Sequence, residues 1–97
     1  MVHLGMIRTV RHRGLRRLID NNDRSGLSAQ HLHRIMDIVA HLNIATRPND
    51  LDMPGFRLHG LKGTYKGFWS VRVSGNLRLI FRMEDGNVYD VDLVDYH

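Results

Sequence analysis

Three segments in the second half of the chain alternate between apolar and polar residues. We expect strands over 68–73, 77–83 and 87–94, because alternation with a period of two gives a strand one buried face and one exposed face. Turn-forming residues separate the three segments, so consecutive strands are joined by hairpins. The pattern therefore predicts an antiparallel sheet, with a further strand over 56–61 before it.

The length of each hairpin loop decides which side chains share a face, because a slip of one residue turns a strand over. A two-residue turn at Asp85-Gly86 mixes apolar and charged residues on both faces. A three-residue loop with Gly86 in the left-handed conformation separates them. We therefore predict three-residue loops at 84–86 and 74–76, with these opposed pairs: Phe81–Tyr89, Leu79–Val91, Leu77–Leu93, Val73–Leu77, Val71–Leu79 and Trp69–Phe81.

The first half of the chain predicts two helices. Leu15, Leu18 and Ile19 form an apolar stripe over 13–21, and a second helix begins after Ser28, a favourable N-cap residue. Apolar residues follow at spacings of three and four, and they give that helix one apolar face: Leu32, Ile35, Met36, Val39 and Leu42. The fold class is therefore α+β, with two N-terminal helices packed on the apolar face of an antiparallel sheet.

The beginning and the length of the chain define one domain. A chain of 97 residues has room for a single core, and we assign it to 6–97. Residues 1–5 precede a second methionine, and we interpret them as an upstream extension or as residues added by cloning. Residues 6–11 alternate like a short strand.

Composition excludes several classes of protein. The chain has no cysteine, so disulfides and thiolate metal sites are excluded. It has no apolar run near the roughly 20 residues of a membrane span and no secretory signal at its start. These features fit a cytoplasmic protein.

The charge balance indicates a polyanionic partner. Fourteen Lys and Arg residues oppose ten Asp and Glu residues, and twelve of the fourteen are arginine. Guanidinium groups hold phosphates in a planar fork. Nucleic acid is therefore one expected partner, and a merely basic soluble surface is the alternative.

The predicted register leaves charged residues on the face away from the helices. This face contains Ser70, Arg72, Arg78, Ile80, Arg82, Asp90 and Asp92. Arg72 is expected opposite Arg78, and Arg78 opposite Asp92. Like charges across strands are unfavourable, so one interpretation is an anion site. The other is a surface pair of Arg78 and Asp92 with Arg72 in solvent.

Further candidate residues lie at both ends of the predicted sheet. Arg57 and His59 alternate onto the polar face, and Lys62 follows at the strand end. The chain finishes with Asp95-Tyr96-His97, which brings a carboxylate, a phenol and an imidazole together. A metal site from His59, His97, Asp92 and Asp95 is conceivable, but the spacing lacks the pattern of a zinc signature, and we expect no metal. The other histidines we interpret as solvated.

Four segments together resemble the HigB-type toxins of the RelE/ParE superfamily. They read RLHGLKG (57–63), GFWSVRV (67–73), NLRLIF (76–81) and DYH (95–97), and the resemblance extends over about 6–97. Leu77 departs from the family pattern, where an aromatic residue often follows the asparagine. The predicted register puts Leu77 in the core, so we expect this departure to affect packing more than chemistry.

The resemblance implies a RelE-like fold, cleavage of mRNA in the ribosomal A site, and inhibition by a helix-turn-helix antitoxin of the HigA type. No cofactor is implied, because the ribose 2′-hydroxyl serves as the nucleophile. The family's catalytic residues map onto His59, Lys62, Arg78, Asp95, Tyr96 and His97. We expect phosphate contacts from Arg72, Arg57 and Arg82, and an orienting role for Asp92.

Two other functions are compatible with the same fold, since fold alone does not determine function. A ParE-like protein binds DNA gyrase instead of cutting RNA. A non-catalytic module binds RNA or an antitoxin through the same basic face. The terminal Asp-Tyr-His and the His59/Lys62 pair favour the ribonuclease.

Overall fold

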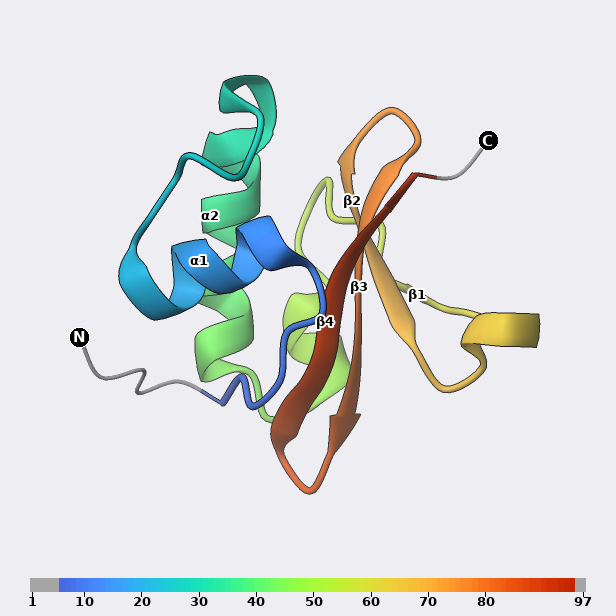
Figure 1. Cartoon of the computed structure of the whole chain (residues 1–97). Coiled ribbons are helices and arrows are strands. Elements are labelled where there is room, and N and C mark those ends of the chain that lie inside the picture. Colours follow the sequence, from blue (N-terminus) through green and yellow to red (C-terminus); the bar gives the residue numbers. More distant parts are fainter. Residues whose placement is uncertain (1–5, 96–97) are drawn as a thin grey trace.

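The computed structural model describes residues 6–95 and confirms the α+β class, with two helices on one side of a four-stranded antiparallel sheet (Figure 1). Helices α1 (Arg13–Asn21) and α2 (Ala29–Ile44) come first, followed by the 3-10 turn η1 (Pro48–Leu51). The remaining elements are β1 (His59–Gly60), the 3-10 turn η2 (Gly63–Tyr65), β2 (Trp69–Ser74), β3 (Leu77–Glu84) and β4 (Asn87–Asp95). Within these residues no helix is both long and apolar enough to span a bilayer.

Both helices begin where the sequence predicts, but their caps differ from expectation. His12, which we had interpreted as solvated, is the N-cap of α1, and its Nδ1 accepts a hydrogen bond from the Leu15 amide at 3.2 Å. Ser28 occupies the N-cap position of α2, yet its side chain makes no capping hydrogen bond. The start of α2 therefore depends on packing more than on its cap.

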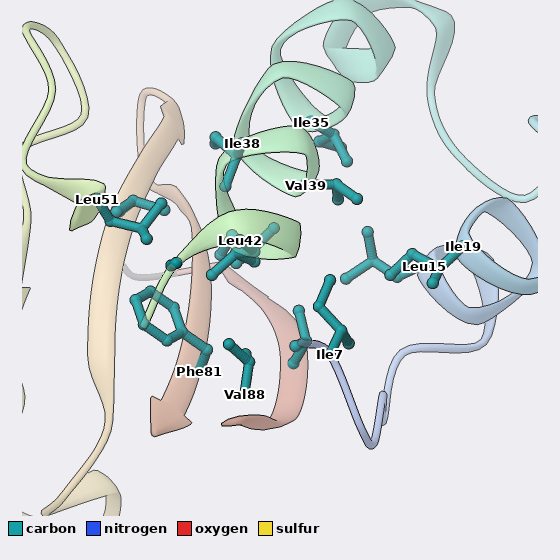
Figure 2. Packing of buried hydrophobic residues seen from close by; sticks show 14 of the residues in the cluster. Ile7, Leu15, Ile19, Ile35, Ile38, Val39, Leu42, Leu51, Phe81 and Val88 are labelled. Atoms are coloured by element: carbon teal, nitrogen blue, oxygen red, sulfur yellow. The ribbon is translucent and has the colours of Figure 1, made fainter. Parts of the chain in front are cut away.

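The core lies between the helices and one face of the sheet. Figure 2 shows side chains of α2 meeting those of α1 and of the strands. Leu42 of α2 and Phe81 of β3 are completely buried, as the apolar patterns predict. Removing either side chain would cost roughly 2–5 kcal/mol of stability, so this layer holds the sheet in place.

The N-terminal segment runs beside β4 without forming the predicted strand over 6–11. Two isolated parallel bridges, Ile7↔Val88 and Val10↔Val91, join it to β4. The bridges are three residues apart on both sides, so the regular ladder of a strand is interrupted. The physical reason lies in β4, where Asp90 between the two bridges has a left-handed φ of 56° that breaks the extended conformation.

The strand predicted over 56–61 is reduced to two residues, His59–Gly60. Arg57 has a positive φ of 52°, a left-handed conformation that breaks an extended strand. Phe56 is nevertheless buried in the core, as expected. His59 still pairs with β2, opposite Ser70.

The register of β2 with β3 agrees with the prediction except next to the turn. Trp69 pairs with Phe81, Val71 with Leu79, and Arg72 with Arg78. At the turn Leu77 pairs with Ser74 instead of Val73, because the register shifts after Arg72. The opposition of the two arginines is thus confirmed.

The predicted register of β3 with β4 was wrong. Arg82 pairs with Tyr89 and Glu84 with Asn87, which is the two-residue turn that we had rejected. Asp85 and Gly86 both have positive φ, at 53° and 78°, as a type I′ turn requires.

With this turn, a regular β4 would place apolar and charged side chains on both faces of the sheet. A β-bulge in β4 prevents this. Beyond Arg82↔Tyr89 the register shifts, and the next pairs are Ile80↔Asp92 and Leu79↔Leu93. Two residues of β4, Asp90 and Val91, therefore oppose the single residue Phe81. Asp90 has a φ of 56°, the left-handed conformation found at the first position of such bulges.

The shift changes the neighbours of every residue in the second half of β4. Arg78 lies opposite Val94 and not Asp92, and Leu77 lies opposite Asp95 and not Leu93. Val88 and Val91 are both completely buried, so the bulge keeps both valines on the core side.

Candidate active site

The face of the sheet away from the helices, which we call the open face, holds most of the predicted site residues. Alternation along the strands assigns it these side chains: His59, Ser70, Arg72, Arg78, Ile80, Arg82, Tyr89, Asp92 and Val94. Ser70 and Ile80 are completely buried there, although neither lies in the helix-side core. The open face is therefore a packed surface whose long polar residues surround a small buried centre.

Two neighbouring rows across the strands contain four of the predicted residues. One row runs His59–Ser70–Ile80–Asp92, and the next runs Arg72–Arg78–Val94. Side chains directly opposite each other on one face have Cβ atoms roughly 4.5–5.5 Å apart. His59, Arg72, Arg78 and Asp92 thus lie within adjacent rows of the same face.

The backbone around Arg72 is held from two sides. Its amide donates to the Phe56 carbonyl at 2.7 Å, and its carbonyl accepts from Arg34 Nε at 3.2 Å. Arg34 also donates to the Gly55 carbonyl and stacks over the Phe56 ring at 4.7 Å. This arginine of α2 therefore fixes β2 against the segment that leads to His59.

The Arg78 guanidinium turns toward the β2–β3 hairpin. Its Nη1 donates to the Gly75 carbonyl at 2.6 Å and approaches the Leu77 carbonyl at 3.4 Å. These contacts orient the group without neutralising its charge, because carbonyls carry no net charge. A half-buried cation with fixed orientation can stabilise charge that develops on a bound anion.

Arg82 lies four residues further along β3 than Arg78, and its partners are different. Its Nε donates to Asp90 at 2.8 Å, its Nη1 donates to Glu84 at 3.1 Å, and it stacks over the Tyr89 ring at 4.9 Å. The hydrogen bond to Asp90 raises the pKa of Arg82. The same bond holds the pKa of the Asp90 carboxyl below its ordinary value, an effect to which the charge of Arg11 adds.

These contacts give Arg82 acidic partners that Arg72 and Arg78 lack among the interactions described above. The contact of Arg82 with phosphate stays a prediction. The same guanidinium also has a structural role, because it donates to Asp90 and Glu84. Arg57 and Lys62 are exposed. The chain moves away from the Arg72 row between His59 and Lys62, because Gly60 pairs with Trp69.

The terminal part of the predicted site is described only in part. Asp95 ends β4 beside the Arg78 row, opposite Leu77. Tyr96 and His97 lie outside the described residues. The predicted cross-strand pair of Arg78 and Asp92 does not form, because Arg78 lies opposite Val94 and Asp92 lies opposite Ile80. The Asp92 carboxylate accepts from the Leu93 amide at 2.9 Å. Among residues 6–95 no group of three metal-ligating side chains gathers.

Ser70 is the one buried residue of the described chain whose side-chain oxygen has no hydrogen-bond partner. It lies between His59 and Ile80 in its row, two residues from Arg72. Burying a hydroxyl without a partner typically costs about 1–3 kcal/mol. Exceptions of this kind often mark functional sites.

Sequence reasoning missed three residues that support the open face, Thr9, Arg11 and Arg34, and it placed Asp90 on that face without predicting its bulge. One signal for Asp90 was present, since apolar residues of β4 change from the even position Val88 to the odd positions Val91 and Leu93. Such a change of phase indicates a bulge. The partners of Arg11, Thr9 and Arg34 are far away in sequence and leave no local signal.

Comparison with known proteins places this chain in a family. Residues 8–97 match the family described as RelE-like toxin of type II toxin–antitoxin system HigB. The chain belongs to the HigB-like toxin family. It is also 36% identical over 92 residues to a protein named Endoribonuclease HigB from Proteus vulgaris, covering 95% of this chain and 100% of that relative.

Two solved structures share the fold of this HigB-like chain. The YoeB–YefM complex from Staphylococcus aureus matches with a TM-score of 0.59 at 18% identity, over 94% of each chain. The YoeB dimer from the same organism matches with a TM-score of 0.57 at 17% identity, over 99% of each chain. The predicted RelE-like fold is thus confirmed.

The unpartnered hydroxyl of Ser70 leads to a prediction on stability. We expect Ser70→Ala to raise the free energy of unfolding by about 1 kcal/mol, because it removes a buried group without a partner. Urea unfolding followed by circular dichroism measures this. Ser74→Ala, at an exposed position of the same strand, is the matched control and should stay within about 0.5 kcal/mol of the parent. A clear loss of stability in Ser70→Ala would contradict the interpretation.

Proposed function

We propose that this chain is the toxin of a type II toxin–antitoxin pair and acts as an endoribonuclease that cuts translated mRNA in the ribosomal A site. The observation that carries the proposal is the Arg72–Arg78 opposition in the row next to His59. Membership of the HigB-like family and the similarity to Endoribonuclease HigB support the same chemistry. Translation takes place in the cytoplasm, which we propose as the site of action.

The open face suits the charge that appears during RNA cleavage. When a 2′-hydroxyl attacks the adjacent phosphorus, the phosphate becomes a phosphorane with additional negative charge. One well-placed donor stabilises such charge by about 3–4 kcal/mol. We assign this role to Arg78 and Arg72, whose side chains share the open face, and to Lys62, which lies between β1 and η2.

Two proton transfers complete the reaction. A base takes the proton of the 2′-hydroxyl while the 2′-oxygen bonds to phosphorus, and an acid protonates the 5′-oxygen as the P–O5′ bond breaks. The products are a 2′,3′-cyclic phosphate and a 5′-hydroxyl. Imidazoles suit both roles, because their ordinary pKa lies near 6.5. We assign the two roles jointly to His59 and His97.

The remaining candidates hold these groups in place. We propose that Asp92 or Asp95 keeps an imidazole in one tautomer and that Tyr96 orients the base or donates a hydrogen bond. Arg57 and Arg82 are proposed as outer phosphate contacts. No metal or cofactor is required in this scheme, since the nucleophile belongs to the substrate.

The proposed partners follow from the same assignment. The ribosome presents the codon, and the basic surface of the chain contacts mRNA and ribosomal RNA. A helix-turn-helix antitoxin of the HigA type is the proposed inhibitor. The solved YoeB–YefM complex contains a chain of this fold together with a second protein.

The role of His97 gives a direct prediction. A chain that ends at Tyr96 should lose mRNA cleavage and growth arrest while its melting temperature is unchanged. His33→Ala, a change in α2 far along the sequence from the open-face strands, is the control and should remain toxic. Full toxicity of the truncated chain would rule out His97. Growth arrest without mRNA cleavage in the parent would favour a gyrase inhibitor.

The role of Arg78 gives a second prediction. We expect Arg78→Ala to lower kcat by about 10²–10³-fold with a small change in melting temperature, because Arg78 lies on the open face and outside the core. Arg47→Ala removes an exposed arginine next to η1 and is the matched control with normal turnover. A large drop in melting temperature with normal turnover would show that Arg78 is structural.

A further inference from the structure

The bulge at Asp90 determines which side chains near the end of β4 lie on the open face. If pairing continued regularly from Arg82↔Tyr89, Ile80 would oppose Val91 and Leu79 would oppose Asp92. With the bulge, Asp92 lies opposite Ile80 on the open face, and Leu93 lies opposite Leu79. A single extra residue therefore moves Asp92 from the core side to the open side.

The N-terminal segment holds this bulge through one hydroxyl. The Asp90 amide donates to Oγ1 of Thr9 at 2.7 Å, and Oγ1 donates back to Oδ1 of Asp90 at 3.3 Å. At the next residue of β4, the Val91 amide donates to the Thr9 carbonyl at 3.2 Å, and the Val91 carbonyl accepts from the Arg11 amide at 2.8 Å. Thr9 thus satisfies the amide that a bulge leaves without a partner in the ladder.

The carboxylate of Asp90 is held from the open face as well. Arg82 donates to it at 2.8 Å, and Arg11 approaches it at 3.6 Å. A left-handed aspartate is less favourable than a left-handed glycine. The chain therefore accepts a strained residue and surrounds it with contacts, a combination that concentrates at functional sites.

We propose that Thr9 and Asp90 are positioning residues of the candidate active site. The Thr9 hydroxyl holds the bulge, and the bulge places Asp92 on the open face. This inference rests on the proposed ribonuclease function. That the Thr9 hydroxyl holds the β3–β4 register is independent of the proposed function.

A series at Asp90 separates the backbone conformation from the carboxylate. Asp90→Gly and Asp90→Asn keep a residue that tolerates positive φ but lose the charge. Asp90→Val loses the charge and also disfavours positive φ, because valine is β-branched. Thr9→Ser keeps the hydroxyl and Thr9→Val removes it with little change in size.

The first measurement is cleavage of mRNA on programmed ribosomes, with kcat and KM obtained separately. We expect Asp90→Gly, Asp90→Asn and Thr9→Ser to retain kcat within about tenfold. We expect Asp90→Val and Thr9→Val to lose about 10²-fold in kcat with KM little changed, as a small misplacement of catalytic groups does. Equal loss in Asp90→Gly and Asp90→Val would overturn the proposal, since the carboxylate itself would then be needed.

The second measurement is the β3–β4 register by NMR, from the backbone contacts of Ile80 with Asp92 or with Val91. Thr9→Val should weaken the bulged register, and Thr9→Ser should preserve it. Thr9 is exposed, so Thr9→Val should fold even if Asp90→Val does not. An unchanged register in Thr9→Val would overturn the proposal whatever the activity. If the parent chain cleaves no RNA, the proposed function fails while this register test still decides whether Thr9 locks the bulge.

Discussion

Strand β3 has apolar side chains on its helix side and arginines on its open face, and this alternation constrains the register of both neighbouring strands. Leu79 and Phe81 are completely buried under the helices, while Arg78 and Arg82 alternate with them on the open face. A shift of either neighbouring strand by one residue would exchange its faces. Burying an unpaired guanidinium costs several kcal/mol, whereas repulsion at a partly solvated surface costs roughly 1 kcal/mol. The Arg72–Arg78 opposition is therefore the smaller cost.

Contacts between segments far apart in the chain hold the open face in this form. Thr9 and Asp90 are 81 residues apart in sequence, and Arg34 reaches 38 residues to the backbone of Arg72. Both contacts join a peripheral segment to the backbone of a strand, and neither uses an open-face side chain of the proposed chemistry. The candidate site is thus positioned by the tertiary fold, through contacts of α2 and of the N-terminal segment.

Local signals predicted most of the fold. The apolar stripe over 13–21 and the N-cap at Ser28 gave both helix starts, and alternation gave β2, β3 and their register, including Arg72 opposite Arg78. The predicted β3–β4 register was wrong because we assumed that β4 is regular. A two-residue turn followed by a bulge in β4 keeps the apolar residues on one face, and a three-residue loop with a regular strand does so too. The conformation of Arg57 and the partners of Arg34 depend on distant residues and could not be read from the sequence. The candidate site was predicted as residue types on one face. The structure places His59 in the row next to Arg72 and Arg78, and Asp92 lies opposite Ile80 and not opposite Arg78.

The central claim is that the arginines and His59 of the open face cut mRNA during translation. The most direct test is to map mRNA 5′ ends in cells that express the chain, with translation running and with translation blocked. The account predicts new 5′ ends within translated codons that disappear when translation is blocked. Growth arrest without new mRNA ends, or the same cuts in the absence of translation, would contradict it.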